Sequence, residues 1–496
     1  MMAQAQNNKK NLIGLTGVPL VMVLGNSMLI PILPTMKSEL HLTSFQTSFL
    51  ITAFSIAAGI IIPLAGYLSD RFNRKVVITI ALTLYGAGGL LAGLASLWLT
   101  NPYWLIICGR VLQGIGAAGT SPIAMALVGD LFDGASESKA LGLLETSNGL
   151  GKVLSPILGA LFALWTWYAV FLAFPVICAV VLTIFLLLVK EKKQNKQPKS
   201  VKEYLGSIGQ IFKQNGKWLI PAFFIGSICL STLFGVLFYL SDLLEETYQI
   251  DGILKGAFLA IPLLALSIMA FITGAIIKKR LTVMRYFIIA GMLLLTISYA
   301  GASFVSNVYF LIGILVFGSV GTGMILPCLN SMIIGAVTKT ERGMITSLYN
   351  GVRFIGVALG PPIFTWLLGF STKVMFYSIA SVTLLFAIIA FFTITPQKGS
   401  NSQGASQEGT VKKESSADGN SMDSSKSAGT KSEAESSAKE KNLLDQKALD
   451  EMTLLLEMRE ETKDQQKQEQ LKKELGFDLG DLFEKLLTKK EKDKTK

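Results

Sequence analysis

The stretch that decides the fold is Gly66-Tyr-Leu-Ser-Asp70-Arg71-Phe-Asn73-Arg74-Lys75, at residues 66–75. Its second half places one acid and three bases within six residues, directly between two apolar segments, 45–68 and 76–98. Each of these segments is long enough to cross a bilayer as an α-helix. Because so short a charged connector cannot form a domain, we expect it to be a tight turn at a membrane surface.

Composition supports this reading along the whole chain. Of the 496 residues, 51% are hydrophobic and only 16% are charged, against about 25% charged in a soluble domain. The apolar residues come in repeated runs of about 20 without alternation of period two, which favours helices over barrel strands. We therefore expect an all-α membrane protein.

The net charge of +11 would suit a nucleic-acid partner, but the bases lie in short loops beside the apolar runs. Membrane topology explains that placement better, so we expect no nucleic-acid partner. The sequence also lacks a phosphate-binding glycine loop and a Cys/His metal cluster. This argues against a nucleotide-driven pump and a metalloenzyme.

The apolar runs predict twelve transmembrane helices. Their approximate ranges are 12–33, 45–68, 76–98, 103–131, 140–164, 167–189, 218–243, 254–277, 283–305, 308–337, 344–369 and 372–395. Most basic loop residues fall on one side of this arrangement, whereas the other side holds only Lys37, Lys255 and Lys373. Cytoplasmic loops carry the excess of Lys and Arg, so we expect both termini in the cytoplasm and the bundle in the cell (plasma) membrane.

An internal repeat divides the helices into two halves. A shift of 205 residues aligns four Gly or Pro pairs, which are Gly116 with Gly321, Pro122 with Pro327, Gly151 with Gly356, and Pro156 with Pro361. Each pair constrains the backbone. Two pseudo-symmetric six-helix bundles are the architecture of alternating access, with substrate bound between the halves.

The expected domains follow from the repeat and from changes in composition. They are an N-terminal bundle (1–189), a cytoplasmic linker (190–217), a C-terminal bundle (218–395), a disordered linker (396–440) and a charged helical tail (441–496). The tail is either weakly structured or a surface helix that contacts lipid or a protein partner.

The charged loop allows two interpretations. Gly66 would let the second helix approach a neighbour, and Asp70 is expected at the start of the third helix, where its charge suits the helix dipole. Arg71, Arg74 and Lys75 can pair with Asp130 at the end of the fourth helix. The loop is then either a basic topology anchor or a conformational latch made of breakable ion pairs.

Polar residues inside the spans identify a candidate transport pathway. Arg110 in the fourth helix is followed by Gln113, and either faces a cavity or is a structural residue bonded to backbone carbonyls. In the fifth helix, Glu145, Asn148, Lys152 and Ser155 fall on one stripe. A carboxyl group away from water exchanges protons readily near neutral pH, which makes Glu145 the candidate proton carrier. The alternative is a static pair of Glu145 with Lys152 or an arginine.

The equivalent eleventh helix contributes Asn350 and Arg353 near mid-membrane, and the first helix offers Asn26 but no acid. The intramembrane charges are then Arg110, Lys152 and Arg353 against Glu145, which would bias the cavity towards an anionic or zwitterionic substrate.

Three of these motifs resemble those of the Major Facilitator Superfamily. Residues 66–75 are similar to its signature loop Gly-x-x-x-Asp-Arg-x-Gly-Arg-Arg/Lys, with Asn73 in place of the second glycine; asparagine tolerates the left-handed conformation that the glycine would adopt. The fourth helix, from Arg110 to Ala118, looks like its Arg-x-x-Gln-Gly-x-Gly-Ala-Ala motif. The fifth resembles its antiporter motif Gly-x-x-x-Gly-Pro-x-x-Gly-Gly through Gly151, Ser155, Pro156, Gly159 and Ala160.

The resemblance covers about residues 10–395 and implies the twelve-helix drug:proton antiporter branch, of a bacterial, Gram-positive-like type. It implies that the loop gates the conformational switch, that Asp130 joins its charge relay, and that Arg110 takes part in proton transfer. It also implies export rather than import through the antiporter motif.

We therefore expect a proton-coupled exporter of small amphiphilic compounds, and not an enzyme. Its partners would be substrate, protons and the lipid bilayer, with the proton gradient as energy source, no cofactor, no metal and a functional monomer. The alternatives are a flippase for an anionic lipid or glycolipid, and a membrane sensor or scaffold that acts through the tail.

Overall fold

The computed structural model describes residues 2–132, 134–191, 201–277, 280–337 and 341–394, and within these ranges it is helical without a β-strand. The expected linker and tail at 396–496, and the part of the expected cytoplasmic linker at 192–200, lie outside these ranges. The helices are α1 (Met2–Ser27), α2 (Leu33–Glu39), α3 (Ser44–Arg71), α4 (Arg74–Trp98), α5 (Tyr103–Ala118), α6 (Ser121–Leu131), α7 (Gly134–Ala163), α8 (Ala169–Leu188), α9 (Val201–Asp242), α10 (Gly252–Ile277), α11 (Leu281–Ala302), α12 (Val308–Gly335), α13 (Arg342–Leu368) and α14 (Thr372–Thr393).

Eleven helical segments of the described chain are long and apolar enough to cross a membrane. The more polar helix α7 lies between the fourth and fifth of these segments, and holds Glu145 and Lys152. Together they match the twelve predicted runs, with boundaries that differ by a few residues at most ends.

Two predicted helices are interrupted. In the first span, α1 ends at Ser27, and the chain continues through the 3-10 helix η1 (Ile30–Ile32) into α2. Pro31 and Pro34 lie in the first turns of η1 and α2. The fourth span breaks at Gly119 and Thr120, after which Pro122 stands in the first turn of α6. A proline cannot donate the backbone bond that a continuous helix requires, so both breaks follow from proline chemistry.

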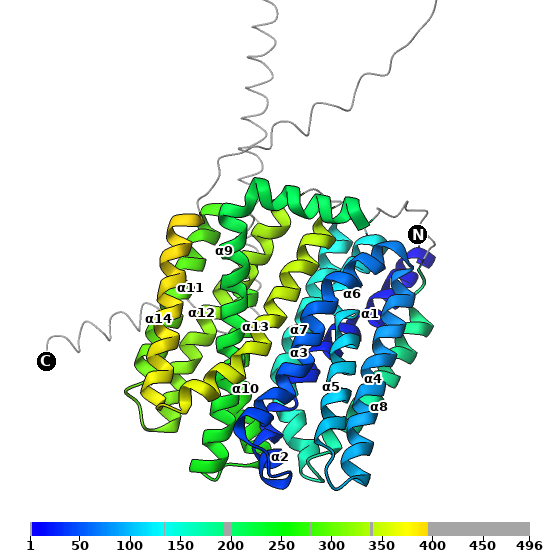
Figure 1. Cartoon of the computed structure of the whole chain (residues 1–496). Coiled ribbons are helices and arrows are strands. Elements are labelled where there is room, and N and C mark those ends of the chain that lie inside the picture. The colour runs from blue at the N-terminus through cyan, green and yellow to red at the C-terminus, as the bar shows by residue number, and fades with distance from the viewer. Residues whose placement is uncertain (1, 133, 192–200, 278–279, 338–340, 395–496) are drawn as a thin grey trace, which may run out of the picture. The chain divides into compact units, whose positions relative to one another are not determined.

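The two halves repeat the same helix pairings. In the first half α4 packs on α5 and α8, α3 on α5, and α1 on α7; in the second, α11 packs on α12 and α14, α10 on α12, and α9 on α13. These are the pairs that the 205-residue shift relates. Figure 1 shows all of these helices running roughly side by side as one bundle.

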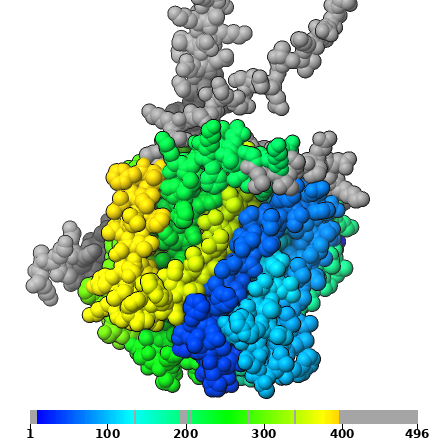
Figure 2. Space-filling view, in the orientation of Figure 1, coloured from blue at the N-terminus to red at the C-terminus, as the bar shows by residue number. Residues whose placement is uncertain are grey.

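The halves meet through two equivalent helix pairs, α3 with α13 and α7 with α10. Along the first pair, a Cβ placed on Gly59 would lie 3.0 Å from the Gly351 carbonyl oxygen, and one on Gly351 would lie 2.7 Å from that of Gly59. The buried Thr52 hydroxyl donates to the Ala358 carbonyl at 2.7 Å. The absence of side chains at the two glycines therefore allows α3 and α13 to approach closely. Figure 2 shows blue surface of the first half in contact with yellow surface of the second.

Helix α9 begins well before its span and bends. Its first part lies across the upper end of the bundle in Figure 1, before the helix turns into the bundle. The ring centroids of Phe212 and Phe223 are 5.6 Å apart, although eleven residues of straight helix would separate them by about 16 Å. Gly216 lies between them, and glycine is a common site of such bends. The first part contacts the first half through Tyr204, whose ring lies 5.1 Å from that of Tyr67.

Candidate functional site

Arg110 ties together three helices of the first half. Its side chain is fully buried, and its guanidinium donates to the carbonyls of Leu50 at 3.0 Å and Gly25 at 2.8 Å. It also donates to the side-chain oxygens of Gln113 at 2.9 Å and Asn26 at 2.6 Å. The ring of Phe54 covers it at 4.4 Å. A buried guanidinium with this many acceptors is stabilised without a carboxylate, so the geometry favours the structural interpretation of Arg110.

This arrangement corrects the placement of two residues. Asn26 and Gln113, expected to line the substrate cavity, are buried inside the first half as partners of Arg110. Asn26 also donates to the Ser55 hydroxyl at 2.8 Å. The reason is that the buried Arg110 guanidinium binds the side-chain oxygens of Gln113 and Asn26, which keeps both amides out of any open cavity.

The charged residues of α7 and α13 interact electrostatically between the two halves. Lys152 is half-buried and interacts electrostatically with both Glu145 and Arg353. Arg353 is half-buried too, lies over the Tyr349 ring at 5.3 Å and donates to Asn350 at 3.2 Å. Asn148 is also half-buried. Two cations from opposite halves therefore interact electrostatically, and of these two Lys152 also interacts with Glu145, so the charge in this region is biased positive.

Glu145 differs from its expected environment. It was expected to be removed from water, but its side chain is exposed on the surface of the protein. The reason is that Glu145 lies about two turns before Lys152. It is in the first half of α7, where neighbouring helices give less cover. Near Gly142, for example, no atom would come within 4 Å of an added Cβ.

The charged loop forms one of the suggested ion pairs, between Arg74 and Asp130, and an additional pair between Arg74 and Asp70. Arg74, which is only 9% exposed, lies between two acids: its Nη2 is 3.3 Å from Asp70 Oδ1 and its Nε is 2.8 Å from Asp130 Oδ2. The pair with Asp130 joins the start of α4 to the last turn of α6. We call the end of the bundle that holds Arg71, Arg74, Lys75 and Arg342 the basic end.

Asp70 lies elsewhere than expected. It is in the last turn of α3, not at the start of the third transmembrane helix. Its carboxylate approaches α13 instead, since Oδ2 would be 3.9 Å from a Cβ on Gly343 in the first turn of that helix. Gly66 also faces α13, because a side chain there would clash with Ser347. The favourable helix dipole for Asp70 is therefore that of α13, which belongs to the other half.

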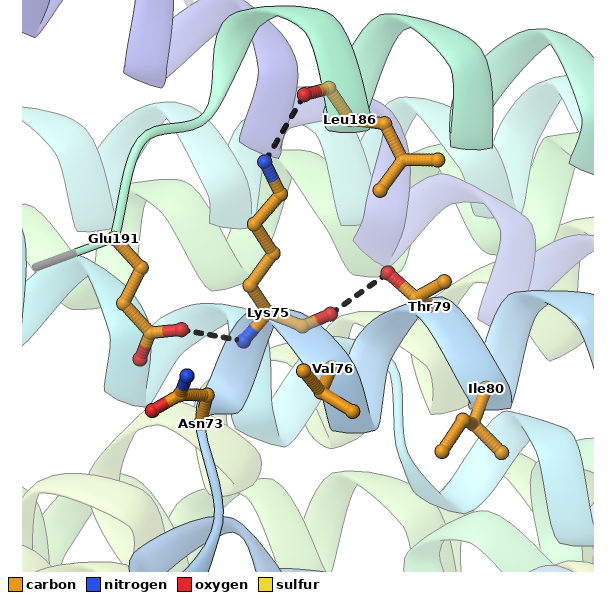
Figure 3. A pocket seen from close by; sticks show the side chains of 7 residues that line it. All are labelled: Asn73, Lys75, Val76, Thr79, Ile80, Leu186 and Glu191. Carbon is orange, nitrogen blue, oxygen red and sulfur yellow. Dashed lines mark hydrogen bonds between the residues drawn. The ribbon is translucent and has the colours of Figure 1, made fainter. Parts of the chain in front are cut away.

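A reciprocal contact between α4 and α8 completes the loop (Figure 3). The Glu191 carboxylate accepts the backbone N–H groups of Arg74 at 3.1 Å and Lys75 at 2.8 Å, at the start of α4. The Lys75 ammonium donates to the carbonyls of Leu186 and Val189 at the end of α8, at 3.0 and 2.6 Å. Figure 3 shows the bonds of Lys75 with Glu191 and Leu186. Each side chain thus satisfies the free backbone groups at the other helix's terminus. Together they line a pocket of about 320 Å³.

Asn73 is the residue before α4 and has extended backbone, with φ −60° and ψ 126°. The left-handed conformation that would explain a glycine at this position is therefore not used. The loop turns without it, because Glu191 supplies the cap that the Asn73 side chain does not provide.

The residues of the predicted packing motif lie at close helix contacts. A side chain at Gly159 would clash with the Met28 backbone, and one at Gly356 would clash with Ser227 on α9. Gly151 has a looser contact with Leu20, at 3.6 Å from an added Cβ. The Ser155 hydroxyl donates to the Gly151 carbonyl, and Pro156 and Pro361 stand inside α7 and α13.

A second charged cluster, which sequence reasoning missed, joins the halves at the end opposite the basic end. The Lys37 ammonium on α2 lies 2.7 Å from Glu246, and the Thr35 hydroxyl donates to Glu245 at 3.2 Å. Glu245 also pairs with the buried Lys255 of α10. The two glutamates lie in the π-helical turn η2 (Leu243–Thr247) after α9. The adjacent acids Glu245 and Glu246 were the available signal.

Comparison with known proteins identifies the chain's relatives. The family model of the Major Facilitator Superfamily matches residues 15–288 and 284–424. The chain belongs to the Major Facilitator Superfamily. This membership makes the protein a multi-pass membrane transporter and not an enzyme, and the two repeated six-helix bundles are that superfamily's fold.

Among superfamily members, the bacillibactin exporter of Bacillus subtilis (strain 168) is 47% identical over 396 residues, which are 79% of this chain and 98% of the relative. Multidrug resistance protein 1 of the same organism is 26% identical over 74% of this chain and 91% of its own length. The crystal structure of the human organic anion transporter MFSD10 (TETRAN) superposes with a TM-score of 0.60 at 17% identity, covering 77% of this chain and 99% of that one.

Proposed function

We propose that this transporter exports a siderophore of the bacillibactin kind from the cytoplasm, in exchange for protons. The observation that carries the proposal is the electrostatic interaction between two cations of opposite halves, Lys152 and Arg353, in a region where Lys152 also interacts with Glu145. A site with this charge suits a substrate rich in anionic or acceptor oxygens. The bacillibactin exporter of Bacillus subtilis, which is 47% identical to this chain over 396 residues, exports a molecule of the siderophore class.

Orientation follows from the distribution of charge. The basic end faces the cytoplasm in this proposal, with both chain termini on that side and the bundle in the plasma membrane. The cluster of Lys37, Glu245, Glu246 and Lys255 then faces outward.

Transport proceeds by alternating access of the two halves. At the basic end, Asp70 reaches the first turn of α13 in the other half, and Arg74 positions this acid by pairing with Asp70 and Asp130 within the first half. We propose that these contacts, with Gly66, Arg71 and Lys75, form the latch that must open for substrate to enter from the cytoplasm. Glu145 is the proposed exchanger of protons, and its attraction to Lys152 transmits the change of charge to the substrate site.

A second candidate function is efflux of amphiphilic drugs. Multidrug resistance protein 1 supports it at 26% identity. A flippase for an anionic lipid would use the same cations, and a sensor or scaffold would act through residues 397–496.

A transport assay with purified protein discriminates among these candidates. Inside-out proteoliposomes are supplied in parallel with bacillibactin, with a cationic dye and with a fluorescent anionic lipid. The proposal predicts saturable uptake of bacillibactin that the dye does not inhibit. Uptake of the dye alone would replace it with drug efflux, and lipid movement alone with a flippase. Deletion of residues 397–496 should leave transport intact, whereas a scaffold would lose its activity.

A further inference from the structure

The last turn of α9 holds a carboxylate that the proposed transport cycle has not used. Asp242 is half-buried, and its Oδ1 is enclosed without a hydrogen-bond partner among the described residues. The same side chain lines a pocket of about 230 Å³ between α3, α9 and α13. An unpaired buried carboxylate oxygen is unfavourable, because it has lost its bonds to water and gained none in exchange.

The pocket lies at the contact between the halves. Ser44 contributes from the first half, and Phe238, Tyr239 and Phe364 contribute aromatic walls from the second. Close by, the Ser241 hydroxyl donates to the Ile30 carbonyl at 2.8 Å, which joins α9 to the end of the first span. Any motion that parts the halves at this end would therefore bring water to Asp242.

The charged neighbours do not neutralise Asp242. The groups that interact with it are Lys37 from α2, Lys255 from α10, and Glu245 and Glu246 from η2; α3 and α13 contribute only uncharged residues to its pocket. Both lysines already have partners, since Lys37 pairs with Glu246 and Lys255 with Glu245. Three carboxylates thus share two ammonium groups, and Asp242 is the acid left without a cation of its own.

We propose that Asp242 is a proton-binding site whose occupation holds the end opposite the basic end closed. A proton on the carboxyl removes the excess negative charge and makes burial of the group tolerable, so the closed arrangement is favoured. Loss of the proton leaves a buried, unpaired charge, which is relieved when the halves part and water enters. Deprotonation therefore opens this end and protonation closes it.

The direction of this effect fits exchange of substrate for protons, and to that extent the inference rests on the proposed function. A proton taken up from outside by the open form would close the outer end, after which the basic end can open to the cytoplasm. Asp242 would then set the direction of the conformational change, whereas Glu145 acts on the substrate site through its attraction to Lys152.

Distance measurements between the halves test the proposal without substrate. Spin labels are attached at Asn101→Cys in the first half and Lys373→Cys in the second, both exposed near this end, in a chain whose exposed Cys108 is replaced by serine. In lipid nanodiscs the parent should show a short distance in acid and a growing population of longer distances as pH rises. Asp242→Asn, which mimics the protonated form, should keep the short distance at every pH.

Glu39→Gln is the control, because Glu39 is an exposed acid on α2 near the same end but is not among the groups that interact with Asp242. It should retain the parent's response to pH. Two results would overturn the proposal. One is that the distances in the parent, which carries no substitution at Asp242, do not change with pH. The other is that the distances in Asp242→Asn respond to pH as those in the parent do.

Transport measurements separate this proposal from the proposed function. If Asp242→Asn abolishes the pH response of the distances while the parent's export ignores a proton gradient, Asp242 is a proton site and exchange with protons is wrong. If export follows the gradient in both parent and Asp242→Asn, and both respond to pH alike, the exchange stands and the Asp242 proposal fails.

Discussion

The Arg74 guanidinium lies 2.8 Å from the Asp130 carboxylate, and this pair joins the start of α4 to the end of α6 at the basic end. The same guanidinium contacts Asp70 at 3.3 Å, but the Asp70 side chain is 47% exposed and that of Asp130 only 18%. One arginine therefore connects the loop to the fourth span, while Asp70 also reaches the first turn of α13 in the other half.

The two acids should differ in the kind of defect that their removal causes. Asp130→Asn leaves the enclosed Arg74 short of a partner, and should lower the free energy of unfolding by about 2 kcal/mol. Asp70→Asn should cost less than about 1 kcal/mol of stability, because exposed ion pairs contribute little. It should nevertheless reduce transport more than its stability loss explains, because it weakens the contact between halves. Thermal unfolding in detergent and initial transport rates measure the two effects; equal loss of stability and transport in both variants would contradict a latch.

The clamp between Glu191 and Lys75 should affect stability. Glu191→Ala removes the acceptor for two N–H groups at the start of α4, where a negative charge also interacts favourably with the helix dipole. We expect a loss of about 1 kcal/mol, and a smaller loss for Glu191→Gln, which keeps an acceptor. The midpoint of thermal unfolding checks this; an unchanged midpoint in Glu191→Ala would show that the cap contributes nothing.

The glycine contact between α3 and α13 should be essential. Gly351→Val introduces a side chain where the Gly59 carbonyl and Pro63 leave no room, and overpacking of this kind costs about 1–3 kcal/mol. Gly274→Val on α10 is the control, because nothing lies within 4 Å of a Cβ there. Gly351→Val should abolish transport and lower the thermal midpoint, whereas Gly274→Val should change neither strongly. Similar behaviour of the two variants would argue against this approach as the joint between halves.

The central cations should determine affinity for the substrate. Arg353→Gln and Lys152→Gln each remove one positive charge from the region between the halves, and each should raise the KM for an anionic substrate about tenfold, as expected for one lost charge-assisted hydrogen bond. Arg353→Lys should retain most of the affinity. Transport kinetics in proteoliposomes provide the measurement, and an unchanged KM in both glutamine variants would remove the cations from the substrate site.

Arg110 offers a test between its two interpretations. Arg110→Lys cannot reach the carbonyls of Leu50 and Gly25 and the two amide oxygens together. If the role is structural, the variant should lose about 2 kcal/mol of stability, and the protein that remains folded should keep its dependence on the proton gradient. Normal stability with lost gradient dependence would instead establish the part in proton transfer that the family resemblance implies.

Much of the fold could be predicted from local patterns. Apolar runs and the charged loop give the number and approximate ends of the spans, because the bilayer fixes helix length. The 205-residue shift gives the two halves, and the pairing of Arg74 with Asp130 follows from the need to neutralise charge at helix ends. The broken spans at Pro31 and Pro122 were visible as prolines, but proline also occurs inside continuous helices here, such as Pro156 in α7.

The site could be predicted only in part, because its missing pieces depend on contacts between distant segments. Glu191 meets the start of α4 more than a hundred residues away in sequence, and no local pattern marks it as a cap. Asn26 and Gln113 looked like cavity residues until the packing of three helices directed them to Arg110. The second charged cluster combines Lys37 with Glu246, which only the association of the two halves brings together.

We propose that exchange with protons drives transport, and a sudden change in the pH gradient tests this most directly. Purified protein in inside-out proteoliposomes is supplied with bacillibactin, and uptake is followed after a pH gradient, acid inside, is imposed and again after an ionophore collapses it. If protons drive export, bacillibactin should accumulate against its own gradient, and this accumulation should stop when the ionophore is added. Uptake by Glu145→Gln should equal the rate that the parent shows after the pH gradient has collapsed. Uptake that proceeds equally with and without the gradient would contradict the proposal.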